Sequence, residues 1–256
     1  MSQSIVPAIE EKQLDTSPTL TFEEYRFYKV DDEIKHELHR GQLIPIAMPT
    51  ILHINICEYL VYKLQRHLAK NNLDLVVKRN LGVRTEENSS RIPDIVVCTK
   101  SLLEQVAARP GGAVLDFDET PLLLIEVVGK DRRADYVLKR GEYELANVPE
   151  YCIVDPTENR QRVRVAAFPE GDEVYSQVDY LPGEEMVSVV FPNLRLSVDE
   201  ILCPPLVERL IKEEQRRLQE LRQSPTTERQ RADREHQRAE RLAARLRELG
   251  VDPDTV

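Results

Sequence analysis

The chain has 256 residues, of which 41% are hydrophobic and 31% are charged, and its formal net charge is −10. This length suffices for one well-buried domain with some chain left for appendages, whereas two full domains would be crowded. The aromatic content of 5%, without tryptophan, argues against a stacking platform for single-stranded nucleic acid.

The cysteines lie far apart, at positions 57, 98, 152 and 203, and form no Cys-x-x-Cys pair. This is typical of reduced core residues rather than of a zinc or redox site. The first residues lack a signal-peptide pattern, and no run approaches the roughly 18 apolar residues of a membrane span. We therefore expect a soluble, cytoplasmic protein without a membrane partner.

The beginning of the chain, residues 1–20, mixes Pro, Ser, Gln and Glu without periodicity, which predicts a disordered segment. Thr21 then begins a helix, because Glu24 stands three residues later, as in a capping box. Residues 34–46 predict two short strands around a turn at Arg40-Gly41.

A long helix is predicted next, from Ile51 to about Lys70, because apolar residues recur there at helical spacing. Residues 74–79 and 92–98 predict strands, and residues 101–108 predict a further helix that ends before a Pro-Gly-Gly sequence.

The run Leu-Leu-Leu-Ile-Glu-Val-Val at 122–128 is typical of a strand that is covered on both faces of a sheet. A helix is predicted at 131–146 and a second buried strand at 151–155. Later strands are predicted at 163–168, 173–178 and 186–190. This order of strand, helix and strand indicates an α/β domain with a mixed sheet over residues 21–203.

The last segment, residues 204–256, changes to Arg, Glu, Gln, Leu and Ala and predicts a helical tail. Ser224-Pro225 interrupts the apolar stripe and suits the N-cap and first position of a second helix. The apolar residues of that second helix have a 3-4-3 spacing. This spacing predicts either a short coiled-coil seam for self-association or a solvated amphipathic tail, and the pattern favours neither.

The net negative charge of the chain lies in the domain and not in the tail. Residues 207–256 hold 12 basic and 11 acidic residues, which leaves 23 basic and 34 acidic residues in 1–206. A domain with this net negative charge is unfavourable for binding a duplex through phosphate contacts, although a local group of basic residues beside a metal site could bind the phosphates.

Two carboxylates lie in apolar surroundings, where removing their charge from water costs free energy. Glu126 interrupts the apolar run, and an ionised carboxylate there loses several kcal/mol of solvation unless a cation or metal pairs with it. Alternatively, Glu126 faces water at the end of its strand. Asp94 follows Pro93 at the start of another buried strand, where it is equally typical of a turn. Together, carboxylates on adjacent strands favour a shared Mg²⁺ ion.

The helix after Glu126 carries Asp135, Lys139 and Tyr143 at four-residue intervals, which places them on one face. They form either a salt-bridged surface stripe or a face directed at the sheet. In the second case Lys139 would reach a metal-bound water or the scissile phosphate as a point charge. The nearby carboxylates favour the second interpretation.

Glu37 lies on an early strand, where it would either complete a metal shell or remain a solvated strand residue. His36 and His39 are three residues apart on the same strand and point to opposite faces. They therefore make a poor pair of metal ligands, and we assign them no role.

Six short segments follow one another along the domain. They are TFEEY at 21–25, HELHRGQL at 36–43, RIPDIVV at 91–97, LIEVV at 124–128, Asp135-x3-Lys139-x3-Tyr143, and VPEYCIVD at 148–155. In order and spacing they resemble the Uma-type family of putative restriction endonucleases, within the PD-(D/E)xK nuclease superfamily. The resemblance runs from about Thr21 to Leu202 and leaves out the tail.

This resemblance implies a restriction-endonuclease-like fold, with a mixed central sheet flanked by helices. It implies Asp94 and Glu126 as metal ligands and Glu37 as the early acidic residue. Catalysis and metal binding would thus share these three residues.

The catalytic lysine departs from the superfamily pattern. Its usual position, two residues beyond the glutamate, holds Val128 here. The resemblance points to Lys139 on the following helix, with Lys130 as the alternative. The loop at 128–131 also differs from the usual family loop and is one residue shorter.

The combined hypothesis is an endonuclease that uses Mg²⁺ or Mn²⁺ to hydrolyse phosphodiester bonds, with DNA as the expected partner. The main alternative is a catalytically silent nuclease-like fold that acts as an interaction module through its helical tail. The acidic body favours this alternative, whereas the retained buried charges disfavour it. A homodimer through the core or the C-terminal helices is compatible with both.

Overall fold

The computed structural model describes residues 19–29 and 34–248, with only the backbone described for residues 222–232 and 247. The disorder predicted for residues 1–20 therefore falls almost entirely outside the described residues. Among the described helices, none is long and apolar enough to span a membrane.

The first helix begins where the sequence predicted. α1 (Phe22–Arg26) is capped by Thr21, whose side chain accepts a hydrogen bond from the backbone N–H of Glu24 at 3.2 Å. The Glu24 carboxylate accepts in return from the backbone N–H of Thr21 at 2.8 Å. Two otherwise unpaired N–H groups are satisfied in this way, which confirms the capping box.

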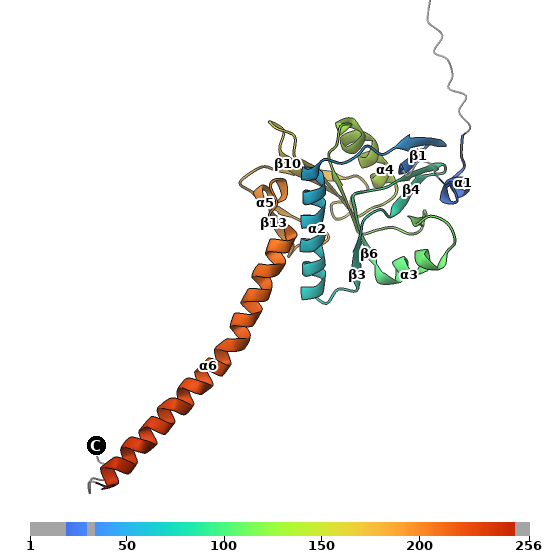
Figure 1. Ribbon diagram of the computed structural model, residues 1–256. Coiled ribbons are helices and arrows are strands. Elements are labelled where there is room, and N and C mark those ends of the chain that lie inside the picture. The colour runs from blue at the N-terminus through green and yellow to red at the C-terminus, as the bar shows by residue number, and fades with distance from the viewer. Residues whose placement is uncertain (1–18, 30–33, 249–256) are drawn as a thin grey trace, which may run out of the picture. The chain divides into compact units, whose positions relative to one another are not determined.

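A five-stranded sheet with the order β2-β1-β5-β4-β7 lies beside α1 (Figure 1). Its strands are β1 (His36–His39), β2 (Gln42–Pro45), β4 (Gly82–Glu86), β5 (Ser89–Arg91) and β7 (Val114–Leu115). The β1–β2 hairpin was predicted, and its turn residues Arg40 and Gly41 have φ values of 51° and 83°. The sequence did not predict β4 and β5, which are short and carry many polar residues, or β7, which has only two residues.

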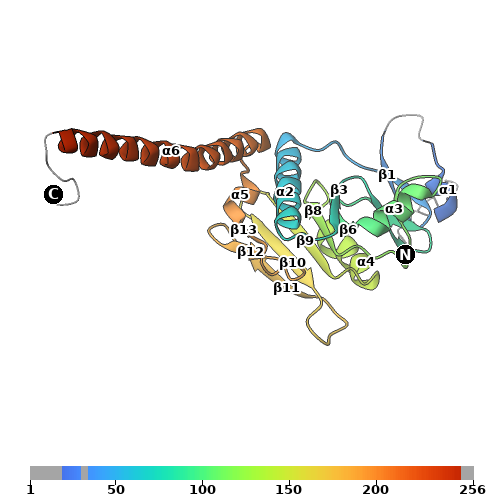
Figure 2. The same cartoon turned by 90° about the horizontal axis from the view of Figure 1, so that it is seen from below.

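A six-stranded sheet with the order β11-β10-β9-β8-β6-β3 forms the centre of the domain (Figures 1 and 2). Its strands are β3 (Leu75–Lys78), β6 (Ile95–Thr99), β8 (Leu123–Val127), β9 (Glu150–Asp155), β10 (Arg162–Ala167) and β11 (Ser176–Tyr180). The sheet is mixed, because β8 and β9 run parallel whereas the other neighbours run antiparallel. β11 begins later than the predicted strand at 173–178.

Helices cover both faces of this sheet, which explains the continuous apolar run of β8. They are α2 (Ile51–Lys70), α3 (Lys100–Ala108), α4 (Arg140–Leu145) and α5 (Val198–Leu202), with a π-helical segment, η1 (Ala134–Lys139), directly before α4. α2 packs through Leu60 and Leu64 on one face. On the other face, Leu124 packs in one buried cluster with Val106 of α3 and Tyr143 of α4. The predicted helix at 131–146 is thus partly π-helical.

A small two-stranded sheet follows, formed by β12 (Glu185–Val187) and β13 (Arg195–Ser197). β12 overlaps the predicted strand at 186–190 but begins one residue earlier, whereas β13 was not predicted. α5 begins directly after β13, and Ser197 caps it.

The chain divides into two compact units, Met1–Pro204 and Pro205–Val256. The second unit consists mainly of α6 (Val207–Glu248), a single helix of 42 residues. The predicted break at Ser224-Pro225 is therefore wrong. A proline inside a helix costs about 3 kcal/mol, and the many strong helix formers on both sides outweigh it. Self-association through this helix stays a prediction.

Candidate functional site

Asp94 lies directly before β6, and Glu126 lies on β8, the neighbouring strand of the six-stranded sheet. The antiparallel register of β6 and β8 pairs Ile95 with Ile125, so the next pair in this register is Asp94 with Glu126. The backbone N–H of Val127 donates to Asp94 Oδ2 at 2.8 Å. The two carboxylates that the sequence indicated are therefore neighbours across the two strands.

One buried ammonium group joins several carboxylates. Lys139 Nζ lies 2.9 Å from Glu126 Oε1, 3.3 Å from Glu37 Oε1 and 3.5 Å from Asp135 Oδ1. Glu37 comes from β1, so the site draws on both main sheets and on η1. Glu37 is buried and is not the solvated strand residue of the alternative interpretation. Lys130 instead lies exposed on the loop after β8.

The helical segment after β8 directs its polar face inward. The exposed fractions of Asp135, Lys139 and Tyr143 are 6%, 9% and 0%, so these residues do not form a surface stripe. Tyr143 donates to Glu126 Oε1 at 3.2 Å. Burial, and then the charge of Glu126, raises the pKa of Tyr143 well above its ordinary value, so this hydroxyl stays a donor. The π-helical turn lies where Lys139 reaches the strand, and such turns frequently occur at functional sites.

The electrostatics of the site are dominated by burial and like charges. Burial first, and then the neighbouring carboxylates, raise the pKa of Glu126 well above its ordinary value, although Lys139 opposes them. Burial also raises the pKa of Asp135 to about 6. Burial would lower the pKa of Lys139, but the carboxylates around it raise that pKa. One lysine thus compensates only part of the negative charge.

Arg91 contacts the second carboxylate oxygen of Glu37, the one that Lys139 does not contact. Its Nη1 lies 3.1 Å from Glu37 Oε2, and its Nε lies 2.7 Å from Glu142 Oε2 on α4. The backbone N–H of Ile92 donates to Glu37 Oε1 at 3.1 Å. His39, which the sequence gave no role, contacts Arg91 Nη2 through Nδ1 at 2.9 Å. Sequence reasoning missed Arg91 and Glu142, although Arg91 begins the segment that contains Asp94.

His53 on α2 was also missed. Its Nε2 lies 2.8 Å from Asp94 Oδ1, and in the tautomer with a proton on Nε2 the ring donates this hydrogen bond to the carboxylate. Cys57 stands one helical turn later, and one ligand atom from each of these three residues lies within 4.8 Å of the others. Burial, and then Asp94, raises the pKa of Cys57 to about 12. The four-residue spacing of His53 and Cys57 was the available sequence signal.

The composition of the site fits a divalent cation. Within the described part of the chain, the cluster brings together five carboxylates and two permanent cations: Glu37, Asp94, Glu126, Asp135 and Glu142 with Arg91 and Lys139. This leaves an excess of negative charge. Carboxylate oxygens are the ligands that Mg²⁺ and Mn²⁺ prefer.

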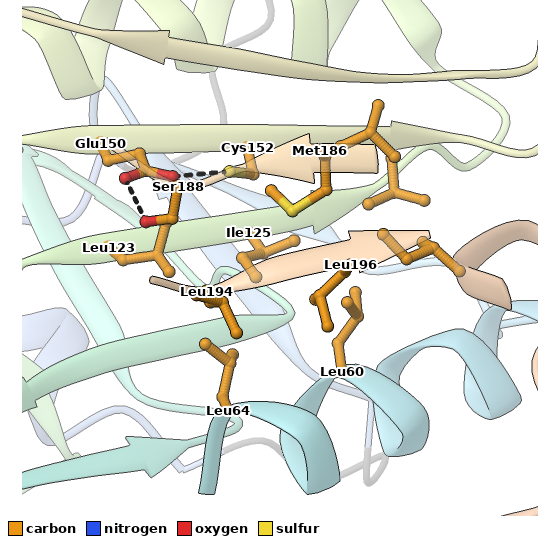
Figure 3. Close-up of a pocket in the computed structure, with 13 residues that line it drawn as sticks. Leu60, Leu64, Leu123, Ile125, Glu150, Cys152, Met186, Ser188, Leu194 and Leu196 are labelled. Carbon is orange, nitrogen blue, oxygen red and sulfur yellow. Dashed lines mark hydrogen bonds between the residues drawn. The ribbon is translucent and has the colours of Figure 1, made fainter. Parts of the chain in front are cut away.

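A cavity lies between α2 and the six-stranded sheet (Figure 3). Its volume of about 10 Å³ is close to the smallest that holds one water molecule, and most of its lining is apolar. Ile125 lines it, and because successive strand residues point to opposite faces, Glu126 points away from it. The cavity is therefore a packing void apart from the cluster of charged residues.

Comparisons with known proteins agree with this fold. The sequence model of the Uma2 family, described as a putative restriction endonuclease, matches residues 22–199. A crystal structure of a putative nuclease belonging to DUF820 from Anabaena variabilis ATCC 29413 is similar with a TM-score of 0.55 and 17% identity, over 72% of this chain and 98% of that chain. No curated protein matches the chain. The predicted α/β fold, a mixed sheet flanked by helices, is confirmed.

Proposed function

Because the chain belongs to the Uma2 family of putative restriction endonucleases, we propose that it is a metal-dependent nuclease that hydrolyses phosphodiester bonds, with DNA as the expected substrate. One observation carries the proposal beyond the family. Three carboxylates, those of Glu37, Glu126 and Asp135, converge on the single ammonium group of Lys139 inside the domain. Ordinary structural ion pairs do not need this excess of negative charge.

Asp94, Glu126 and Glu37 are the proposed ligands of Mg²⁺ or Mn²⁺. When bound, the cation would lower the pKa of a water molecule and polarise a phosphoryl oxygen. Asp94 is the accessible member, because 19% of its side chain is exposed compared with 5% for Glu126. Substrate would therefore approach from the side of Asp94.

Lys139 is the proposed catalytic lysine. Its ammonium group contacts Glu126 and Glu37, so it stands beside the proposed ligands without being one. There it would hold a water molecule or neutralise charge that develops on the phosphate. Tyr143 donates to the same Glu126 oxygen and would keep this carboxylate oriented when Lys139 turns toward substrate.

The acidic body of the domain is the main difficulty for a nucleic-acid substrate, and the loop after β8 offers a local answer. Lys130 is exposed on this loop, which connects the strand of Glu126 to the helical segment of Lys139, and Arg133 is exposed at the start of that helical segment. Two basic side chains beside the site would contact phosphates while the remaining surface stays acidic.

The proposal is tested by incubating the purified full chain with plasmid, single-stranded DNA and RNA, with Mg²⁺, Mn²⁺ or EDTA. We expect metal-dependent cleavage that Asp94→Asn and Glu126→Gln abolish. Glu104→Gln is the matched control, since Glu104 is exposed on α3 and should leave cleavage unchanged. Cleavage that persists in both site variants would contradict the assignment. If the wild type neither cleaves nucleic acid nor binds Mn²⁺, the result favours the silent interaction module.

A further inference from the structure

The Asp94 carboxylate is held by protein donors at both oxygen atoms. His53 Nε2 lies 2.8 Å from Oδ1, and the Val127 backbone N–H lies 2.8 Å from Oδ2. Each carboxylate oxygen offers two lone pairs, so one on each atom remains for another partner. The donors fix the plane of the carboxylate without using all of its acceptor capacity.

We infer that His53 is a positioning residue that orients Asp94 toward the divalent cation. The inference rests on the proposed function. Outer hydrogen bonds of this kind set the direction of metal ligands, and their loss commonly weakens metal affinity 10- to 100-fold, as an order of magnitude. His53 would thus act through Asp94 rather than on the substrate.

The placement of His53 on a long helix supports this role. Thr50 caps α2 and accepts a hydrogen bond from the backbone N–H of His53 at 3.2 Å, so the histidine belongs to the fixed first turn. α2 is 20 residues long and packs on the central sheet. A donor on such a helix is held more firmly than a donor on a loop.

Asp94 needs such a donor more than the other carboxylates do. Among the described residues, the ion pairs of Lys139 are with Glu37, Glu126 and Asp135, and Arg91 pairs with Glu37 and Glu142. Asp94 is paired with His53 instead. Because 19% of its side chain is exposed, water would otherwise compete for the orientation of this carboxylate.

The test compares His53→Leu with His53→Gln, using the Mn²⁺ affinity from isothermal titration calorimetry together with the rate of plasmid cleavage. We expect His53→Leu to weaken Mn²⁺ binding by about tenfold or more and to slow cleavage. We expect His53→Gln to recover most of the affinity, because its side-chain amide reaches a position similar to that of Nε2. His53→Ala gives the same comparison without the bulk of leucine.

Two control variants separate this role from a general disturbance of α2 and from direct binding of the metal by His53. His67→Leu changes a second histidine of α2, which packs against the ring of Phe191, and should leave Mn²⁺ binding unchanged. Cys57→Ser should also leave it unchanged. Equal losses in Cys57→Ser and His53→Leu would overturn the inference, because they would indicate a metal held directly by His53, Cys57 and Asp94.

Failure of the inference and failure of the proposed function give different results. If the wild type binds Mn²⁺ and cleaves while His53→Leu retains full affinity, only the role of His53 is wrong. If His53→Gln is as weak as His53→Leu, the role as a hydrogen-bond donor is likewise wrong. If the wild type neither binds Mn²⁺ nor cleaves, the proposed function fails and the inference fails with it.

Discussion

The Nζ atom of Lys139 lies 2.9 Å from Oε1 of Glu126, and both side chains are buried. The two residues come from a π-helical segment and a central strand, so the contact connects two layers of the domain. Neither charge is stable there alone, since a buried charge without a partner costs several kcal/mol. In the structure, the same lysine is the cation that Glu126, Glu37 and Asp135 share.

Replacing Lys139 by methionine should therefore make the protein depend on metal. Without a divalent cation, we expect Lys139→Met to lose about 3–5 kcal/mol of unfolding free energy, because the carboxylates repel one another. Mn²⁺ should raise the melting temperature of this variant more than that of the wild type. Melting curves in EDTA and in Mn²⁺ measure both effects, and an equal Mn²⁺ response would refute the competition between lysine and metal.

Arg91 should be required for stability as well as for the position of Glu37. Arg91→Met removes the guanidinium group that the buried carboxylates of Glu37 and Glu142 share, while Glu37 keeps its ion pair with Lys139. We expect a loss of about 3 kcal/mol or more of unfolding free energy in urea. Arg91→Lys should recover little, because an ammonium group cannot reproduce the planar contacts of a guanidinium. Arg209→Met on the exposed surface of α6 is the control and should change stability by about 0.5 kcal/mol at most. If Arg91→Met leaves the unfolding free energy unchanged, the pairing is dispensable.

Glu150 offers a stability prediction at a place apart from the cluster of charged residues. It is fully buried beside the cavity and accepts from Ser188 Oγ at 2.7 Å (Figure 3). It also accepts from the Val190 backbone N–H at 2.7 Å. Glu150→Ala leaves these donors unpaired, which costs about 1–3 kcal/mol. Thermal unfolding should detect this loss, while Mn²⁺ affinity stays at the wild-type value. A changed affinity would mean that the cavity and the cluster are coupled.

Asp179 should contribute to the pH dependence of stability. Hydrogen bonds from Arg164, against opposing burial, hold the pKa of Asp179 below its ordinary value, and Arg162 adds to this effect. The unfolded chain has a pKa of about 3.9 at this residue. Since the folded pKa is the lower one, the contribution is complete well above pH 4 and disappears as the pH falls through the folded pKa.

Urea unfolding of the wild type and Asp179→Asn over a pH series measures this contribution. The difference in unfolding free energy should be largest near neutral pH and should shrink toward pH 2, as an approximate limit. A difference that is constant with pH would exclude the ionised Asp179 as its origin.

The sequence predicts those helices and strands in which apolar residues recur in a regular pattern over many positions. The helical spacing after Ile51 predicts α2, and the apolar run around Glu126 predicts β8, because burial on one or both faces sets those patterns. Strands such as β5, with the sequence Ser-Ser-Arg, have no such pattern and depend on neighbours that are distant in sequence. The continuous helix through Pro225 was missed because a local signal was given more weight than its flanks.

The residues of the candidate site also fall into those that the sequence predicts and those that it does not. Asp94 and Glu126 are predictable, because a carboxylate in an apolar strand is costly within its own segment. His53, Arg91 and Glu142 are ordinary residue types in their elements, and only the folded chain brings them to their partners. Arg91 and Glu142, for example, are 51 residues apart in sequence.

Anomalous scattering from wild-type crystals soaked in Mn²⁺ tests the central claim most directly. We predict one strong peak that contacts carboxylate oxygens of both Asp94 and Glu126, with the ammonium group of Lys139 moved away from Glu126. A peak at His53 and Cys57 while Lys139 still pairs with Glu126, or no peak at saturating Mn²⁺, would contradict this claim.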